Sequence, residues 1–177
     1  GAMMGFDAWW QTVEVARRFS NVHLGVSVED QAAADERIPV LLDTEAAVRF
    51  VSYEPALGPV VFNPWLGSDA LVGRGLDWII VGGESGTGAR SFDIAWARAT
   101  VRACREAGVA CFVKQMGSRP HGNFCRLCDG IGRMIDGAVC EDCGGCAVQA
   151  LLDDRKGGDP SEWPRDLRVQ EWPEVTL

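Results

Sequence analysis

Four segments of the chain share one pattern, a short run of apolar and β-branched residues that ends in polar ones. They are residues 21–31, 48–58, 77–86 and 109–117. Such runs are typical of β-strands, and strands that alternate with helical stretches predict a parallel sheet with helices packed outside it. Residues 78–81 are apolar without alternation, which fits a strand buried on both faces. We therefore expect an α/β fold with about four parallel strands.

Helices are expected between these strands. Residues 30–42 form the first candidate, and Pro39 is expected to kink or end it. Residues 92–107 form the second, with Gly108 as its C-terminal stop. In this second helix the apolar residues recur at helical spacing, at Ile94, Ala97, Val101 and Cys104. A further helix is expected over residues 6–19, and the link over residues 57–75 is expected to be mostly loop.

Polar residues gather where the expected strands end. They are Ser27, Glu29, Tyr53, Glu54, Glu84, Ser85, Lys114 and Gln115. Ligand sites in parallel sheets lie at the C-terminal ends of the strands, so these side chains could line a pocket. Glu54 or Glu84 is a candidate general base and Lys114 a candidate electrostatic stabiliser. The alternative for each residue alone is a helix cap or a structural ion pair.

The loop "VGGESGTGAR" after the third expected strand resembles a phosphate-binding loop. Gly83 and Gly88 have the required spacing, but alanine and arginine follow where that loop needs lysine and a hydroxyl residue. Nucleotide hydrolysis is therefore excluded. Backbone amides at Gly83, Gly86 and Gly88 remain candidates for holding a phosphate group of a substrate or cofactor. The alternative is that the glycines allow a sharp turn that places Glu84 at the strand ends.

Five of the seven cysteines cluster in one segment. Cys125 and Cys128 form one Cys-x2-Cys pair, Cys140 and Cys143 form a second, and Cys146 follows. Two such pairs joined by a short hairpin can hold one zinc ion tetrahedrally, with Cys146 as an alternative ligand. Four thiolates leave no open coordination position, so this zinc would be structural. An iron–sulfur cluster is the alternative, because the last three cysteines have compact spacing. Unligated thiols are the remaining possibility.

Charge and composition restrict the class of protein. The formal net charge of −8 opposes binding to nucleic acid, which needs clustered Lys and Arg. No stretch approaches the roughly 20 apolar residues of a membrane span, and no signal peptide opens the chain. The odd cysteine count also argues against a secreted disulfide framework, so a cytoplasmic protein is expected. Residues 1–3 look like a remnant of tag cleavage, which makes Met4 the expected natural start.

The segments "NVHLGVSVEDQAAADERIPVLL", "LDWIIVGGESGTGAR" and "DRKGGDPSEWPRDLRV" resemble a known family. They are similar to uncharacterised phage and prophage proteins described as three-cysteine-motif, radical-SAM-like, over residues 21–114 and 154–172. The resemblance implies a partial β/α barrel in the cytoplasm of a host cell. In longer relatives an N-terminal half carries a Cys-x3-Cys-x2-Cys motif for an iron–sulfur cluster that cleaves S-adenosylmethionine. No cysteines in this chain have that spacing.

Together these features predict three parts. They are a half β/α barrel over residues 4–118, a cysteine-rich zinc-knuckle insertion over 119–150, and a tail over 151–177 that packs back on the barrel. Half a barrel has open edges and an uncovered inner face, so a homodimer or a protein partner that covers the open edge is expected. The predicted function is a zinc-stabilised, partner-dependent binding or regulatory module. The alternatives are an enzyme that uses the strand ends, with radical-SAM-like or acid–base chemistry on a phosphate-containing substrate, and nucleic-acid binding through the cysteine segment.

Overall fold

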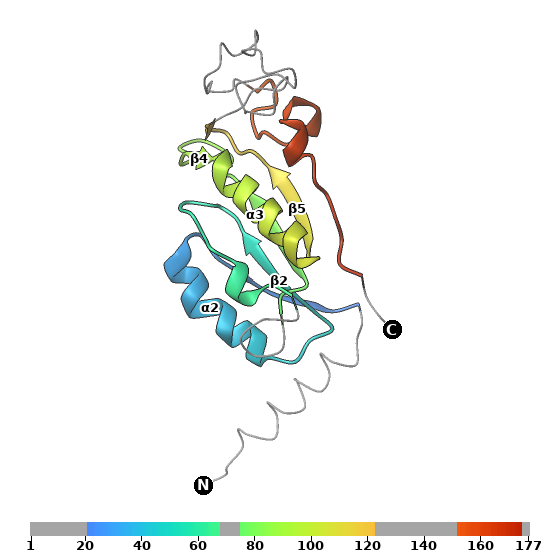
Figure 1. The fold of residues 1–177 in the computed structure, drawn as a ribbon. Coiled ribbons are helices and arrows are strands. Elements are labelled where there is room, and N and C mark those ends of the chain that lie inside the picture. Colours follow the sequence, from blue (N-terminus) through green and yellow to red (C-terminus); the bar gives the residue numbers. More distant parts are fainter. Residues whose placement is uncertain (1–20, 68–74, 123–151, 175–177) are drawn as a thin grey trace.

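The computed structural model describes residues 21–67, 75–122 and 152–174 (Figure 1). Its main sheet is parallel, with the strand order β1-β2-β3-β5. These strands are β1 (His23–Ser27), β2 (Val48–Tyr53), β3 (Trp78–Gly82) and β5 (Ala110–Gln115). Two strands of two residues, β4 (Phe92–Asp93) and β6 (Pro120–His121), pair separately and in parallel. The predicted parallel sheet of four strands within an α/β fold is therefore confirmed.

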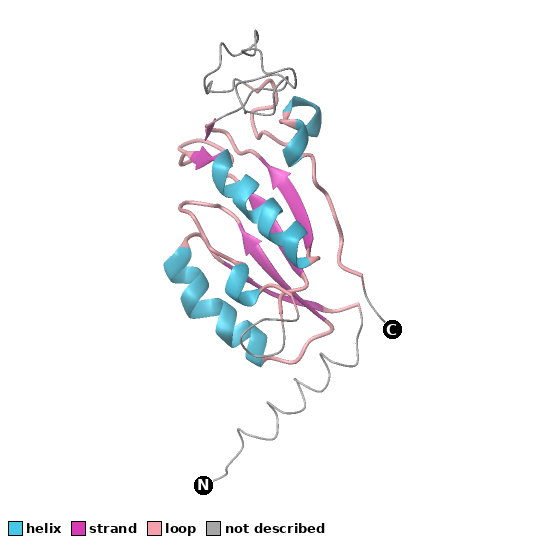
Figure 2. Cartoon of the chain, in the orientation of Figure 1, coloured by secondary structure: helices cyan, strands magenta, loops and turns pink. Residues whose placement is uncertain are grey.

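Two helices cross over between the strands and lie on the same face of the sheet (Figures 1 and 2). They are α2 (Gln31–Asp43), which joins β1 to β2, and α3 (Ile94–Ala107), which precedes β5. Gly108 ends α3 in the left-handed conformation, as predicted. The helix predicted over residues 30–42 is confirmed, since α2 continues past Pro39 to Asp43. Pro39 therefore does not end it, and a kink at Pro39 stays a prediction. Pro39 is exposed, so water can bond the carbonyl group that has lost its N–H partner.

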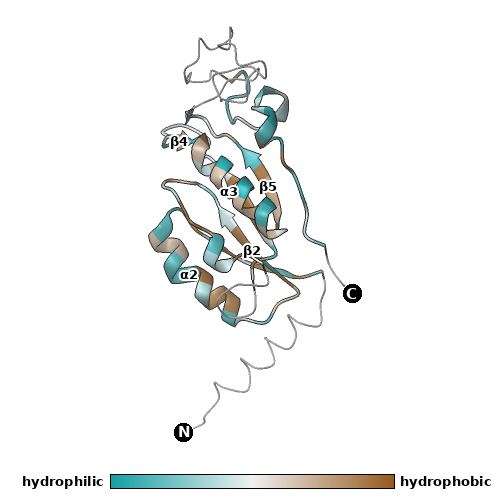
Figure 3. Ribbon diagram, in the orientation of Figure 1, coloured by the Kyte–Doolittle hydropathy of each residue, from teal (hydrophilic) through white to brown (hydrophobic). Residues whose placement is uncertain are grey.

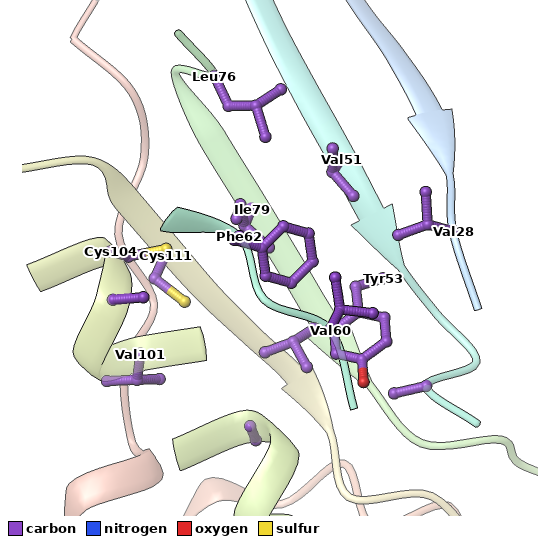
Figure 4. Packing of buried hydrophobic residues seen from close by; sticks show 14 of the residues in the cluster. Val28, Val51, Tyr53, Val60, Phe62, Leu76, Ile79, Val101, Cys104 and Cys111 are labelled. Carbon is purple, nitrogen blue, oxygen red and sulfur yellow. The ribbon is translucent and has the colours of Figure 1, made fainter. Parts of the chain in front are cut away.

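The hydrophobic core lies between this helix-covered face and the two helices. Alternate strand residues point into it, including Val51 of β2, Ile79 of β3 and Cys111 of β5, each no more than 1% exposed (Figure 4). Val101 and Cys104 of α3 meet them from the other side. Burying a side chain of this size stabilises the fold by about 1.5–3 kcal/mol, so this face specifies the register of the strands.

The opposite face of the sheet carries neither α2 nor α3, and we call it the open face. It presents Gly25, Phe50, Trp78, Ile80 and Phe112, which alternate with the core residues along the four strands. Trp78 is the centre of an aromatic cluster on this face. Its ring centroid lies 6.4 Å from that of His23, 5.7 Å from Phe50, 6.2 Å from Phe112 and 4.9 Å from Trp172. Phe50, Ile80 and Phe112 are each only partly buried.

The C-terminal segment runs along the outer edge of β5 (Figure 1). Val113 N–H donates to Val169 O at 2.8 Å, Glu171 N–H donates to Cys111 O at 2.9 Å, and an antiparallel bridge joins Phe112 to Gln170. The segment is also held by Trp163, which is fully buried. Within the described residues, β1 is therefore the edge of the sheet that lacks a neighbouring strand.

Residues 123–151 and residues 1–20 lie outside the described part of the chain, and so do the expected N-terminal helix and most of the expected insertion. The residues on either side of the insertion are described, and they lie together. Met116 N–H donates to Gly157 O at 2.8 Å, and Ser118 Oγ donates to Arg155 O at 2.7 Å. The predicted boundaries 4–118, 119–150 and 151–177 stay predictions.

Candidate functional site

The carboxyl ends of the four parallel strands meet at one edge of the sheet. Figure 3 shows the change along β5, which is hydrophobic over most of its length and hydrophilic where it ends. Three carboxylates follow strands at this edge, Glu29 after β1, Glu54 after β2 and Glu84 after β3. Each of them forms an ion pair with a cation of the same chain.

Glu54 is held by two residues of β5. Its Oε2 accepts from Lys114 Nζ at 2.8 Å and its Oε1 accepts from Gln115 Nε2, also at 2.8 Å. The Gln115 amide donates as well to Gly83 O, at 3.0 Å. A register shift between Val81 and Gly82 brings consecutive β5 residues toward the same carboxylate. The predicted pair of Glu54 and Lys114 is thus brought together, with the Glu54 side chain 15% exposed and that of Lys114 53% exposed.

Glu84 belongs to a different cluster. Its two oxygens accept from Arg90 Nε at 2.8 Å and from Arg90 Nη2 at 2.9 Å, and Oε2 also accepts from Arg90 N–H at 2.8 Å. The hydrogen bonds from the Arg90 side chain, followed by the one from its backbone, lower the pKa of Glu84 to about 2. The carboxylate is therefore ionised at neutral pH and poorly suited to take up a proton, which disfavours the general-base role. In the sequence, Arg90 was notable only because it stands where a phosphate-binding loop needs a hydroxyl residue.

The three candidate phosphate-binding glycines are explained in part by the local backbone. A Cβ atom at Gly83 would come within 2.5 Å of Met116 O, so the strand ends pack too closely there for any side chain. Gly83 N–H donates to Gln115 O at 3.0 Å, and Gly86 N–H donates to Ser118 Oγ at 3.0 Å. Gly86 and Gly88 have φ angles of +103° and +82°, which glycine adopts most readily. This turn returns Arg90 to Glu84, and phosphate binding here stays a prediction.

The third carboxylate, Glu29, is bonded by a residue that the sequence did not single out. Arg37 of α2 approaches Glu29 Oε2 at 3.1 Å with Nη1, which also donates to Ser27 O at 2.7 Å. Tyr53 lies elsewhere than expected. Its side chain is buried in the core, its hydroxyl donates to Gly58 O, and burial raises its pKa. Tyr53 therefore does not line the polar edge.

The expected zinc ligands, Cys125, Cys128, Cys140, Cys143 and Cys146, all lie outside the described residues. Among the described ranges, no three His, Cys, Asp or Glu residues are grouped so as to hold a metal ion. The two described cysteines, Cys104 and Cys111, are buried beside each other in the core (Figure 4).

The comparisons with known proteins identify a family. A family model described as "Protein of unknown function (DUF5131)" matches residues 5–144, which is most of the chain. The chain belongs to this family. The match includes the four strands of the sheet, both described helices, and four of the five clustered cysteines. Searches of curated proteins and of solved structures returned no match.

Membership in this family assigns no activity, since its description is that of a protein of unknown function. The resemblance to phage and radical-SAM-like proteins stays a prediction. Among the described residues, no helix has the length and the apolar character needed to span a membrane.

Proposed function

We propose that the chain is a half β/α barrel that acts as a binding module and depends on a protein partner. The observation that carries this proposal is the open face. Parallel sheets are found with both faces covered, yet here the described helices lie on one face only. Phe50, Ile80 and Phe112 remain partly exposed on the other face. A partner that covered them would complete the layer that the sheet lacks.

The polar edge supports the same proposal. Glu29, Glu54 and Glu84 are each neutralised within the chain, by Arg37, Lys114 and Arg90 respectively. Carboxylates with internal partners organise strand ends well, and the hydrogen bonds from Arg90 lower the pKa of Glu84 to about 2, which disfavours this carboxylate as a general base near neutral pH. The edge is thus a structured polar rim above an apolar face, as expected for a surface that meets another protein.

Zinc is part of the proposal. Cys125, Cys128, Cys140 and Cys143 have the spacing of a closed tetrathiolate site, which stabilises a small module without doing chemistry. The paired attachment points at Met116 and Gly157 support an insertion that leaves the sheet and returns to it at one place. Reduced thiolates of this kind suit the cytoplasm, where we propose that the chain acts.

The open face can be tested with 1-anilinonaphthalene-8-sulfonate, a dye whose fluorescence rises on apolar surfaces. We expect saturable binding to the folded chain, with energy transfer from nearby tryptophans. Phe112→Ser on the open face should weaken binding several-fold. Val61→Ser, at a hydrophobic residue that is 60% exposed and lies outside the sheet, is the matched control and should leave binding unchanged. A folded chain that does not bind the dye, or an equal loss in both variants, would exclude the proposal.

An enzyme that uses the polar edge is the second candidate, and the cluster of Glu54, Lys114 and Gln115 favours it. In that case Lys114 would stabilise an anionic group of the substrate, at the strand ends where ligands of parallel sheets bind. Titration calorimetry with nucleotides and with S-adenosylmethionine tests this function. Binding that Lys114→Met abolishes would support it, and the absence of any saturable binding would exclude it.

A further inference from the structure

The two edges of the sheet differ in their neighbours. At β5 the tail supplies an antiparallel neighbour and bonds Cys111 twice. Glu171 N–H donates to Cys111 O at 2.9 Å, and a Glu171 carboxylate oxygen accepts from Cys111 N–H at 3.1 Å. The Trp172 ring then packs at a tilt against Trp78 and edge-to-face against Phe112. No described strand lies beside β1 on its outer side.

On its outer side, β1 has backbone groups that pair with no described strand. Val28 N–H donates to Ser52 O at 3.0 Å, so the even-numbered residues of β1 face β2. In a parallel ladder the intervening residues direct their backbone groups away from that neighbour, which places those of His23, Gly25 and Ser27 outward. The Ser27 carbonyl group accepts from an Arg37 side chain, in agreement with this assignment.

The apolar surface continues to this edge. A Cβ atom at Gly25 would lie 2.5 Å from the Phe50 ring, so the ring occupies the space that a side chain of β1 would fill. A strand added outside β1 would therefore find aromatic carbon beside it. A strand edge that no described strand covers normally pairs with another strand or is shielded against pairing.

A second copy of the chain cannot complete a barrel at this edge while the tail occupies β5. Two identical half-barrels close into one barrel only if β1 of each copy pairs with β5 of the other. The tail already occupies β5. Contact through the open face alone is too small for any partner, so a stable complex also needs pairing at an edge of the sheet. Four strands at ~4.8 Å spacing, each about six residues of ~3.3 Å, give roughly 380 Å², against about 800 Å² per partner in a stable interface.

The net charge also disfavours a second copy as the partner. Each copy carries a net charge of −8, so two copies repel each other at low salt. The helix that flanks β1 adds to this field, because Asp35, Glu36 and Asp43 of α2 are all exposed. A partner with Lys or Arg beside its docking strand would be attracted to the same place.

From these observations we infer that β1 accepts a parallel strand from a different half-barrel with basic residues beside that strand. The C-terminal tail shields β5 and thereby prevents a second copy from taking this position. The inference rests on the proposed function, because it names the class of partner that the open face requires. It adds that this partner docks at β1 and that the tail sets the choice of partner.

The test uses full-length chains. Glu171→Pro with Trp172→Ser removes both bonds to Cys111 and the ring contact with Trp78, and is designed to release the end of the tail from β5. Raised salt screens the repulsion between copies. Isotope-labelled wild-type chain is mixed with the unlabelled variant, and amide exchange is followed by NMR together with light scattering. Glu171→Gln with Trp172→Phe, which keeps the backbone bond and an aromatic ring, is the matched control.

We expect the wild-type chain to be monomeric, with fast exchange at Gly25 and Ser27. The variant should show fast exchange at Cys111 and Val113. When added to wild type it should form a one-to-one complex that slows exchange at Gly25 and Ser27 at least tenfold. Ser27→Pro in the labelled chain should prevent the complex, because it removes an outward N–H, whereas Ser27→Ala should not.

Three results would overturn the inference. They are a wild-type dimer with β1 amides protected, a mixture in which β5 is released and β1 stays unprotected, and a complex that Ser27→Pro leaves intact. A variant in which Cys111 and Val113 still exchange slowly would count against it as well, because the tail would then not depend on these contacts. Dye binding to the open face is measured independently. Absence of dye binding to the folded wild-type chain would refute the proposed function. Failure of the mixing experiment alone would refute only docking at β1.

Discussion

At the scale of single residues, the polar edge is built from carboxylates that each have a cation of their own. Glu54 and Lys114 were predictable as neighbours, because the ends of parallel strands converge. Arg90 and Arg37 were not, since one comes from a glycine-rich loop and the other from a helix, and no spacing rule links them to strand ends. The sequence thus predicts where the carboxylates gather but not how each is neutralised.

The pair of Glu84 and Arg90 predicts a specific dependence of stability on pH. The pKa of Glu84 falls from 4.5 to about 2 on folding, because Arg90 donates hydrogen bonds to the ionised form. The folded state therefore gains stability from Glu84 above pH 4.5, and this gain is lost as the pH falls toward 2. In urea unfolding at a series of pH values, Glu84→Gln should show a smaller loss over this window than wild type. Equal losses in the two chains would show that the ion pair does not persist in solution.

Lys114 provides a second prediction at this scale. Lys114→Met leaves Glu54, whose side chain is 15% exposed, with Gln115 as its described side-chain partner. Because Lys114 is itself half-exposed, solvent screens the pair, and the loss in unfolding free energy should be about 1 kcal/mol. Lys114→Arg should recover most of it. Urea denaturation at neutral pH and low salt measures the difference, and no loss for Lys114→Met would mean that the pair contributes nothing.

At the scale of elements, the sequence predicted the strands and helices that depend on interactions between residues close together in the chain. The four strands and α3 follow apolar runs, helical spacing and the glycine stop at Gly108, all of which act over a few residues. The pairing of β4 with β6 was missed, since strands of two residues have too little sequence to form a pattern. The pairing of the tail with β5 was also beyond the sequence, because it joins Phe112 to Gln170 across residues that are far apart in the chain.

Two glycines in the loop between β3 and α3 allow the cost of a steric clash to be compared with the cost of an unfavourable φ angle. Gly83→Ala places a Cβ atom 2.5 Å from a backbone oxygen of Met116, and neither strand end can move away easily. We expect a loss of about 3 kcal/mol or more in unfolding free energy, as for other severe core overpacking. Gly86→Ala meets no atom within 4 Å but must adopt φ +103°, which should cost about 1–2 kcal/mol. Thermal and urea unfolding of both variants test this order, and a reversed order would contradict the described backbone.

At the scale of the whole molecule, the sheet and the cysteine segment are expected to be separate in their stability. Thirty-one buried hydrophobic residues of the described chain form the core, and they belong to the sheet, its helices, the loops between them and the tail. The described residues on either side of the cysteine segment contact each other. Met116 N–H donates to Gly157 O, and Gly157 lies close to the backbone of Gly117. A sheet organised in this way does not need a metal ion to fold, whereas a small module of thiolate knuckles does.

Metal content is therefore the prediction that tests the proposed architecture as a whole. The chain should bind one zinc ion and be colourless, and chelation should remove the zinc while the main unfolding transition of the sheet is retained. Cys128→Ser should lose zinc, because it removes one of four ligands, and Cys146→Ser, the matched control, should keep it. Elemental analysis of protein purified without oxygen, together with circular dichroism during chelation, provides the measurement. Brown protein that contains iron would favour a cluster instead. Collapse of the sheet on chelation would show that the two parts fold as one, and the half-barrel would then depend on its metal as well as on its partner.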